Sequence, residues 1–326
     1  MASHPLRWQK TIVFLKTQNL FCHRRNSLLL PYPLPMPRAP FHDYKRPSSY
    51  HITISKHSLS PYWGELTGVL PGVWIRRSAI GDIIARKIYQ MPGLSPSLKM
   101  WQYIVMPDHL HFLVNVCAPL PRHLGHYISM FKNAVIQEAR VNHGIDCPIF
   151  KEDYHDRIIY PGKSIQTVFD YIRANPYRLG VRIACPENFR RINRISIGGT
   201  EVMAYGNIQL LDNPFKGQVV VHRRDTEAEH EANKARWLHI AANGGVLVSP
   251  FISSAEKGVR AVAEEAGGKI ILITNTPFGE RFKPAEHDFN LCAEGRLLLL
   301  APLEPRVLSR AECLFMNSLA AKIAGL

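Results

Sequence analysis

The stretch that most constrains the fold is residues 103–115, which read Tyr-Ile-Val-Met-Pro-Asp-His-Leu-His-Phe-Leu-Val-Asn. Its β-branched and aromatic residues predict an extended strand. Side chains alternate between the two faces of a strand, so His109 and His111 leave the same face. Leu110 and Phe112 then point the other way, into a core. Two neutral imidazoles on one face suit a divalent metal, although a bare His-x-His equally fits two histidines on a half-solvated strand.

Residues 164–180 form a second motif, whose pattern predicts a short helix. Ser164 suits the N-cap position, and Pro176 predicts the end of the helix. Tyr171 and Asn175 are four residues apart and therefore share one face of this helix. Taken alone, Tyr171 also fits an aromatic residue that packs in a core.

Together the two motifs resemble those of the REP-associated tyrosine transposases, which are single-tyrosine transposases of the HUH-endonuclease superfamily. The matching segments are residues 106–111 and 170–176, in the family's order and near its spacing. Two further segments agree with this resemblance: a predicted first strand of the domain at 42–54, and the segment at 150–157 that precedes the tyrosine helix. The resemblance covers about residues 40–190 and implies an α+β HUH-type domain, in which helices cover a small antiparallel sheet.

The resemblance implies a metal-dependent endonuclease and strand transferase. His109 and His111, with the amide oxygen of Asn175 as third ligand, would hold Mg²⁺ or Mn²⁺ at a scissile phosphate. Tyr171 would attack phosphorus and leave a 5′-phosphotyrosine and a free 3′-OH. A phenol with an unperturbed pKa of about 10 needs a fixed position and an activated electrophile for this attack. Asn175 is the less secure ligand, because a residue before proline is pushed out of helical geometry.

The implied substrate is single-stranded DNA beside a hairpin from repetitive extragenic palindromes or similar elements. Tyr62 and Trp63 are candidates for stacking on unpaired bases. Four basic residues are candidates for phosphate contacts: Lys132, Arg157, Arg173 and Arg178. Each of these residues equally fits a core position or a solvated face. We assign no role to His155 and Asp156. Because relatives use their tyrosine in cis or swapped between two subunits, a homodimer is one implied arrangement.

The positive charge of the chain is unevenly distributed. Residues 1–196 hold 26 Lys and Arg against 11 Asp and Glu, whereas residues 197–326 hold 14 against 15. The whole excess of +14 therefore lies in the part that carries the two motifs. A segment this basic favours a polyanionic partner, of which nucleic acid is the commonest in a cytoplasm. A basic surface without a partner is the other interpretation.

Several classes of protein are disfavoured by composition. The 6 cysteines contain no Cys-x-x-Cys pair, which argues against a zinc knuckle and a disulfide framework. No apolar run approaches the roughly 18 residues of a membrane helix. We therefore expect a cytoplasmic, nucleoid-associated protein. Residues 1–40 predict a flexible, Pro-rich and basic segment, in which Met36 is an alternative start to Met1.

The character of the chain changes after Arg194. Short apolar strands alternate with amphipathic helices, which predicts a parallel sheet buried on both faces. We therefore expect a domain boundary there, between an HUH-like domain at 41–194 and a Rossmann-like α/β domain of unknown role at 195–326. Strands are expected at 208–211, 218–221, 244–249, 269–273 and 295–300, and helices at 226–242, 256–265 and 309–323.

The second domain carries no recognised nucleotide motif. Neither G-x-G-x-x-G nor G-x-x-x-x-G-K-[ST] occurs, so a dinucleotide or Walker-type site is unsupported. Because such sheets bind ligands at the carboxyl ends of their strands, the loops at 249–254 and 274–278 are candidates.

Three functions remain open. The first is the single-strand endonuclease and transposase with Tyr171 as nucleophile. The second is a domesticated protein that binds DNA without cleaving it, against which the intact set of His109, His111, Tyr171 and Asn175 counts. The third is a nucleotide-binding enzyme centred on the C-terminal domain, with the first domain as a tether.

Overall fold

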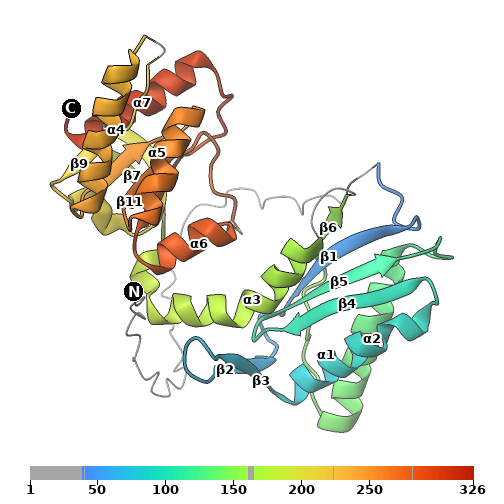
Figure 1. Cartoon of the computed structure of the whole chain (residues 1–326). Coiled ribbons are helices and arrows are strands. Elements are labelled where there is room, and N and C mark those ends of the chain that lie inside the picture. The colour runs from blue at the N-terminus through green and yellow to red at the C-terminus, as the bar shows by residue number, and fades with distance from the viewer. Residues whose placement is uncertain (1–38, 40, 161–164, 223, 281) are drawn as a thin grey trace, which may run out of the picture. The chain divides into compact units, whose positions relative to one another are not determined.

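The computed structural model describes residues 39, 41–160, 165–222, 224–280 and 282–326 (Figure 1). The chain forms two compact units, one ending at Gly180 and the other beginning at Val181. This division falls within helix α3 (Ile165–Ala184), before the boundary that we placed after Arg194. The segment expected to be flexible lies outside the described residues except for Ala39, and so does the expected N-cap Ser164.

The first unit is built on a four-stranded antiparallel sheet in the order β4-β5-β1-β6. Its strands are β1 (Ser48–Ser55), β4 (Leu98–Val105), β5 (His109–Val116) and β6 (His155–Ile159). The stretch expected as one strand is therefore two strands with a turn between them. The Met106 amide donates to the His109 carbonyl at 2.8 Å and closes this turn. Pro107 explains the interruption, since proline has no N–H for a sheet ladder.

Different helices cover the two faces of this sheet. On one face, α1 (Ala79–Gln90) and α2 (Leu124–His143) enclose the main core, and the 3₁₀ helix η1 (Met91–Leu94) follows α1. Tyr50, Ile52 and Phe112 lie in that core and are completely buried. On the other face, Leu113 and Ile159 pack against Ile172 of α3. The alternation of each strand thus sends the histidines to the face that α3 covers.

Helix α3 does not stop at Pro176, as we expected, but continues to Ala184. A proline inside a helix deprives the carbonyl four residues earlier, here that of Ile172, of its N–H partner. The side-chain amide of Asn175 compensates in part. Its Nδ2 donates to the Tyr171 carbonyl at 2.7 Å and lies 3.5 Å from the Ile172 carbonyl.

A hairpin of β2 (Gly64–Thr67) and β3 (Trp74–Arg77) packs on α3 at Gly180. A Cβ at Gly180 would lie 3.1 Å from the Leu70 side chain and 3.2 Å from that of Val73. Glycine therefore allows close approach of the hairpin to the helix that carries Tyr171.

The second unit contains a six-stranded sheet in the order β7-β8-β12-β11-β10-β9. Strands β9 to β12 are parallel, while β8 runs antiparallel to β12 and β7 antiparallel to β8. The strands are β7 (Arg190–Ile197), β8 (Thr200–Gly206), β9 (Lys216–Gln218), β10 (Val246–Ser249), β11 (Lys269–Ile273) and β12 (Leu297–Pro302). The helices are η2 (Pro186–Phe189), η3 (Ile208–Asp212), α4 (Glu227–Ala242), α5 (Ser254–Glu265), α6 (Glu286–Ala293) and α7 (Arg310–Ala324).

Both faces of this sheet are buried, as the apolar strands predicted. Helix α7 and η3 share one cluster with Val246, Ile271 and Leu298. The alternate strand residues, such as Leu247 and Ile270, are fully buried outside that cluster, and α4, α5 and α6 contact the strands. The strand expected at 208–211 is the 3₁₀ helix η3, which the side chain of Asn207 caps. The antiparallel pair β7–β8 and the short helix α6 were also not expected.

Of the helices in the described residues, none is both long and apolar enough to cross a bilayer.

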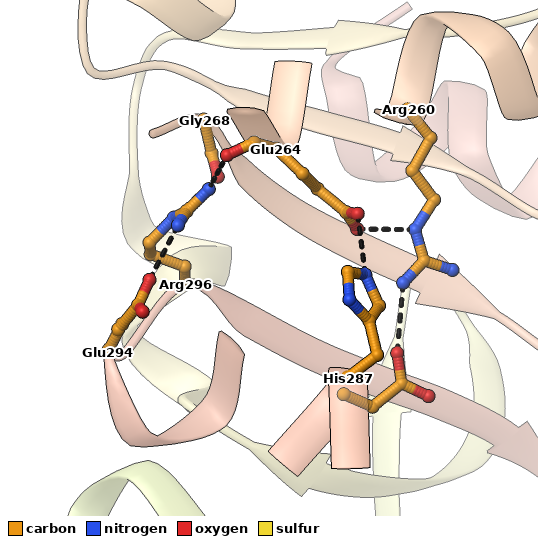
Figure 2. A network of polar contacts seen from close by, with 7 residues as sticks. Arg260, Glu264, Gly268, His287, Glu294 and Arg296 are labelled. Atoms are coloured by element: carbon orange, nitrogen blue, oxygen red, sulfur yellow. Dashed lines mark hydrogen bonds and ion pairs between the residues drawn. The ribbon is translucent and has the colours of Figure 1, made fainter. Parts of the chain in front are cut away.

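A polar network joins α5, α6 and the start of β12 in the second unit (Figure 2). The Glu264 side chain, 9% exposed, accepts from Arg260 Nε at 2.6 Å and lies 2.7 Å from His287 Nε2. Arg260 also donates to Asp288 at 2.9 Å. Arg296 donates to the carbonyl oxygens of Gly268 and Glu264.

We expect Glu264→Ala to lower the free energy of unfolding of the second unit by about 3 kcal/mol, because it removes one partner of a buried ion pair. Hydrogen exchange of the α5 and α6 amides in low denaturant would measure this change. The neighbouring exposed Glu265 provides a matched control, and Glu265→Ala should change the value by less than about 0.5 kcal/mol. Equal effects of the two substitutions would contradict a stabilising role for the network.

Candidate active site

The two histidines of the His-x-His motif lie side by side on β5, and their ring centres are 4.6 Å apart. His109 Nδ1 is 2.6 Å from Asp108 Oδ1. His111 Nδ1 is 2.9 Å from the hydroxyl of Thr53 and 3.2 Å from His51 Nε2. Hydrogen bonding at Nδ1 is the usual way in which proteins orient a histidine that binds a metal through Nε2. The Asp108 carboxylate accepts from His109 Nδ1–H, which leaves the Nε2 lone pair of His109 for a metal. His111 is prepared in the same way in the tautomer whose Nδ1 donates to Thr53 or His51.

The donor set fits a divalent metal in part. His109 Nε2 is buried and makes no hydrogen bond with the part of the chain that the structure describes. A bound cation would satisfy that nitrogen, and imidazole suits Mn²⁺ better than Mg²⁺ on ligand softness. Among the described residues, no group of three or more His, Cys, Asp and Glu side chains is arranged to hold a metal. A metal bound by this pair would need another kind of ligand to complete its shell.

Helix α3 brings Tyr171 to these histidines from sixty positions further along the chain. The centre of its ring lies 5.6 Å from that of His111 and 5.8 Å from that of His51. Both ring pairs are close to perpendicular, at 70° and 72°. Tyr171 is partly exposed and also packs against the cluster of Leu113, Ile159 and Ile172. The phenol and the imidazoles that the sequence singled out thus meet at one place.

The other predicted ligand, Asn175, is 3% exposed and lies one turn after Tyr171. Its side-chain amide donates to carbonyls of its own helix. These bonds use the nitrogen, so the amide oxygen is the atom that would act as a ligand. Its role as a ligand stays a prediction, and its support of the helix at Pro176 is a second reason for asparagine here.

The four basic candidates have different surroundings. Arg157 and Arg173 are exposed and therefore accessible to phosphates. Lys132 donates to the carbonyl oxygens of Lys151 and Glu152 at 2.9 and 2.8 Å. Arg178 is 4% exposed, and its guanidinium carbon lies 5.6 Å from the centre of the Tyr171 ring. Arg178 is thus placed to act on Tyr171 rather than on a DNA backbone at the surface.

The two aromatic candidates differ in the same way. Tyr62 is 60% exposed, whereas Trp63 is completely buried and packs against Phe150 with the ring centres 5.3 Å apart. Of the two interpretations left open for Trp63, the structure shows the core position, so this ring does not stack on bases. Trp63 and Tyr62 are neighbours on an irregular loop, where no period tells which side chain turns inward.

Sequence reasoning missed the contribution of β1. His51 and Thr53 are one alternation apart, which is a local signal that they share a face. The antiparallel register, which pairs Thr53 with His111, is what brings them to the motif. Across β1, Thr53 also pairs with His155 of β6.

Asp156, the other residue without an assigned role, takes part in a separate cluster. The Tyr44 hydroxyl donates to Asp156 Oδ2 at 2.5 Å. Burial raises the pKa of Tyr44, and the bond to Asp156 raises it further. The pKa of Tyr50, which is completely buried and stacks on Tyr44, is also raised by burial. Both phenols therefore stay protonated, and that of Tyr44 serves as a structural hydrogen-bond donor.

The candidate loops of the second unit are closed by their own contacts. Glu256, 4% exposed, accepts from the amides of Val221, Ile252 and Ser253. The amides of Ile252 and Ser253 lie at the start of α5, where a phosphate would otherwise bind, and the carboxylate would repel it. Arg191 donates to the carbonyls of residues 278–280, at and just beyond the end of the other loop. The carboxylate of Glu256 therefore disfavours a phosphate site at the first loop.

Comparison with known proteins finds only distant similarity. No family model matches the chain. An uncharacterized protein of Haemophilus influenzae is 21% identical over 178 residues, which cover 48% of this chain and 91% of that protein. A REP-associated tyrosine transposase, solved with a REP hairpin, is 16% identical over 42% of this chain and 71% of its own, with a TM-score of 0.31.

DNA processing protein A from Helicobacter pylori, solved for its single-stranded DNA binding mode, is 17% identical. That similarity covers 41% of this chain and 65% of the other, with a TM-score of 0.30. At such identities and TM-scores these likenesses carry no argument about function. We therefore base the function on the geometry of the site.

Proposed function

We propose that this protein is a metal-dependent single-stranded DNA endonuclease and strand transferase, a transposase of the single-tyrosine HUH kind. The observation that carries the proposal is the contact of Tyr171 with His111, because two motifs that are remote in sequence converge on one site. In such an enzyme the basic first unit holds the DNA, and the protein acts in the cytoplasm at the nucleoid.

Each residue of the site has a chemical task in this proposal. His109 and His111, oriented by Asp108 and Thr53, would hold Mg²⁺ or Mn²⁺, with the Asn175 amide oxygen as a third ligand. When bound, the ion withdraws charge from a phosphate oxygen. Because the two imidazoles are already fixed by their Nδ1 bonds, they would lose little side-chain entropy on binding.

Tyr171 would form the covalent bond. Its phenolic oxygen attacks phosphorus as the phenolic proton leaves to solvent, and the bond from phosphorus to the 3′ oxygen breaks. The products are a 5′-phosphotyrosine and a 3′-OH, which takes a proton from solvent. The buried guanidinium of Arg178 places positive charge beside the ring where negative charge develops. Because the phosphoester energy is conserved, a 3′-OH can rejoin without ATP.

The substrate of the proposed enzyme is single-stranded DNA flanking a REP-like hairpin. The exposed Arg157 and Arg173 would hold phosphates of the bound strand. A homodimer that exchanges the tyrosine helix is one assembly in which the same residues could act. The target sequence would be decided by base contacts, which phosphate binding does not supply.

The proposal is tested by incubating the full-length protein with 5′- and 3′-labelled hairpin oligonucleotides in Mn²⁺, in Mg²⁺ and in EDTA. We expect a protein–DNA adduct that survives denaturing electrophoresis, carries the label 3′ of the cut, and is absent in EDTA. Tight binding without adduct or cleavage across a broad set of oligonucleotides would instead establish a domesticated DNA-binding protein. If the protein neither binds nor cleaves any of these oligonucleotides, both functions proposed for the first unit are overturned.

A further inference from the structure

One loop presents an aromatic ring to solvent next to the start of the strand that carries His109. This loop, residues 57–63, connects β1 to β2, and its Tyr62 is 60% exposed. Two backbone bonds attach its ends to the β4–β5 turn. The Lys56 amide donates to the Asp108 carbonyl at 2.8 Å, and the Trp63 amide donates to the Pro107 carbonyl at 2.9 Å. These bonds fix both ends of the loop at the turn that leads into His109.

The backbone around Tyr62 is firmly held. The ammonium of Lys56 donates to the carbonyls of His57 and Ser60 at 2.9 and 2.5 Å, so the loop is folded around this charge. Trp63 is buried, and its indole nitrogen donates to the Ser60 hydroxyl at 3.3 Å. The carbonyl of Tyr62 itself accepts from the hydroxyl of Ser78 at 3.0 Å.

A fixed backbone below an exposed ring has an energetic consequence. A ligand that binds to such a ring fixes few rotatable bonds of the protein, because the tyrosine side chain has only two side-chain torsion angles. The loss of conformational entropy on binding is therefore small. An exposed tyrosine on a mobile loop would lose more entropy when it is ordered. The loop is thus built to present Tyr62 for contact rather than to bury it.

The charge beside the ring indicates the class of ligand. Lys56 Nζ lies 5.1 Å from the centre of the Tyr62 ring. A flat aromatic surface next to an ammonium matches an unpaired nucleotide, whose base stacks on the ring while the charge, already bonded to loop carbonyls, attracts its phosphate through space. In a duplex the bases are stacked on each other and present no free face to such a ring.

We propose that Tyr62, with Lys56, forms a base-stacking subsite for single-stranded nucleic acid beside the histidine pair. The placement of this subsite relative to the scissile phosphate rests on the proposed function, but the stacking itself does not. A base held here would lie in the strand that approaches the histidines. The subsite therefore helps to decide which nucleotide stands next to the cut.

The test uses the full-length protein with Tyr171→Phe in every sample, so that cleavage does not consume the DNA. We would measure the Kd for a hairpin oligonucleotide with a single-stranded flank by fluorescence anisotropy. Tyr62→Ala should weaken binding by about 5- to 100-fold, the range of one lost base stack. Tyr62→Trp should retain it. Tyr89→Ala, which removes a 72% exposed tyrosine from α1, should leave it within about twofold.

An abasic scan of the flank identifies the stacked base. We expect one abasic position to weaken binding with Tyr62 present and to have no additional effect in Tyr62→Ala. A Kd that Tyr62→Ala leaves unchanged, or an equal loss for a blunt duplex, would overturn the subsite. The adduct formed by protein with Tyr171 intact is measured separately, so this failure is distinguishable from failure of the proposed function. Thermal unfolding of each variant shows that the fold is retained.

Discussion

Tyr171→Phe should abolish the covalent protein–DNA adduct, with a loss of strand cleavage of at least about 1,000-fold. The substitution removes only the phenolic oxygen, which is the atom that would bond to phosphorus. The ring remains and keeps its packing beside His111 and His51. Binding of uncleaved single-stranded DNA should therefore change by less than about threefold. The adduct is measured on denaturing gels and the binding by anisotropy.

Tyr177 offers a matched control for this experiment. It lies in the same helix, is 38% exposed, and its hydroxyl is as easily removed. Tyr177→Phe should form the adduct at the wild-type rate. If Tyr171→Phe still forms an adduct that survives denaturation, Tyr171 is not the nucleophile. If only Tyr177→Phe loses the adduct, the nucleophile is Tyr177.

His109→Ala should lower the affinity for Mn²⁺ by at least about 10-fold and slow metal-dependent cleavage by about 100-fold or more. His109 suits this test because its buried Nε2 is directed to no protein partner among the described residues. The expected effect of His109→Ala is therefore the loss of a bound cation. Titration of Mn²⁺ by calorimetry or by electron paramagnetic resonance measures the affinity without reference to cleavage.

His126→Ala serves as the control for loss of an imidazole. His126 is exposed on α2, the helix that covers the opposite face of the sheet. Its substitution should leave both Mn²⁺ binding and cleavage within about twofold of wild type. If wild type and His109→Ala bind Mn²⁺ with equal affinity, the histidine pair is not the metal site.

In the described part of the second unit, Glu256 accepts from the amides that precede α5, and Arg191 donates to a carbonyl of the segment after β11. The alternation of short apolar strands and helices predicted the parallel part of its sheet. The basic strand β7 reads as a continuation of the first domain, so the antiparallel pair that it forms with β8 escaped prediction.

The sequence by itself determined the features that depend on a local period. A strand repeats every two residues and a helix about every 3.6, so the shared face of His109 and His111 and the spacing of Tyr171 and Asn175 follow from position alone. Helix starts such as that of α7 at Ser309 follow from local capping in the same way.

Only the tertiary structure decided which of these faces meet. The register of β1 against β5 places Thr53 beside His111, and α3 lies on that same face with Tyr171. Burial of Trp63 and of Arg178 likewise depends on what packs over them. Register and packing are set by the summed burial of many residues distant in sequence, which no local period encodes. The partners of each active-site residue therefore became visible only in the folded chain.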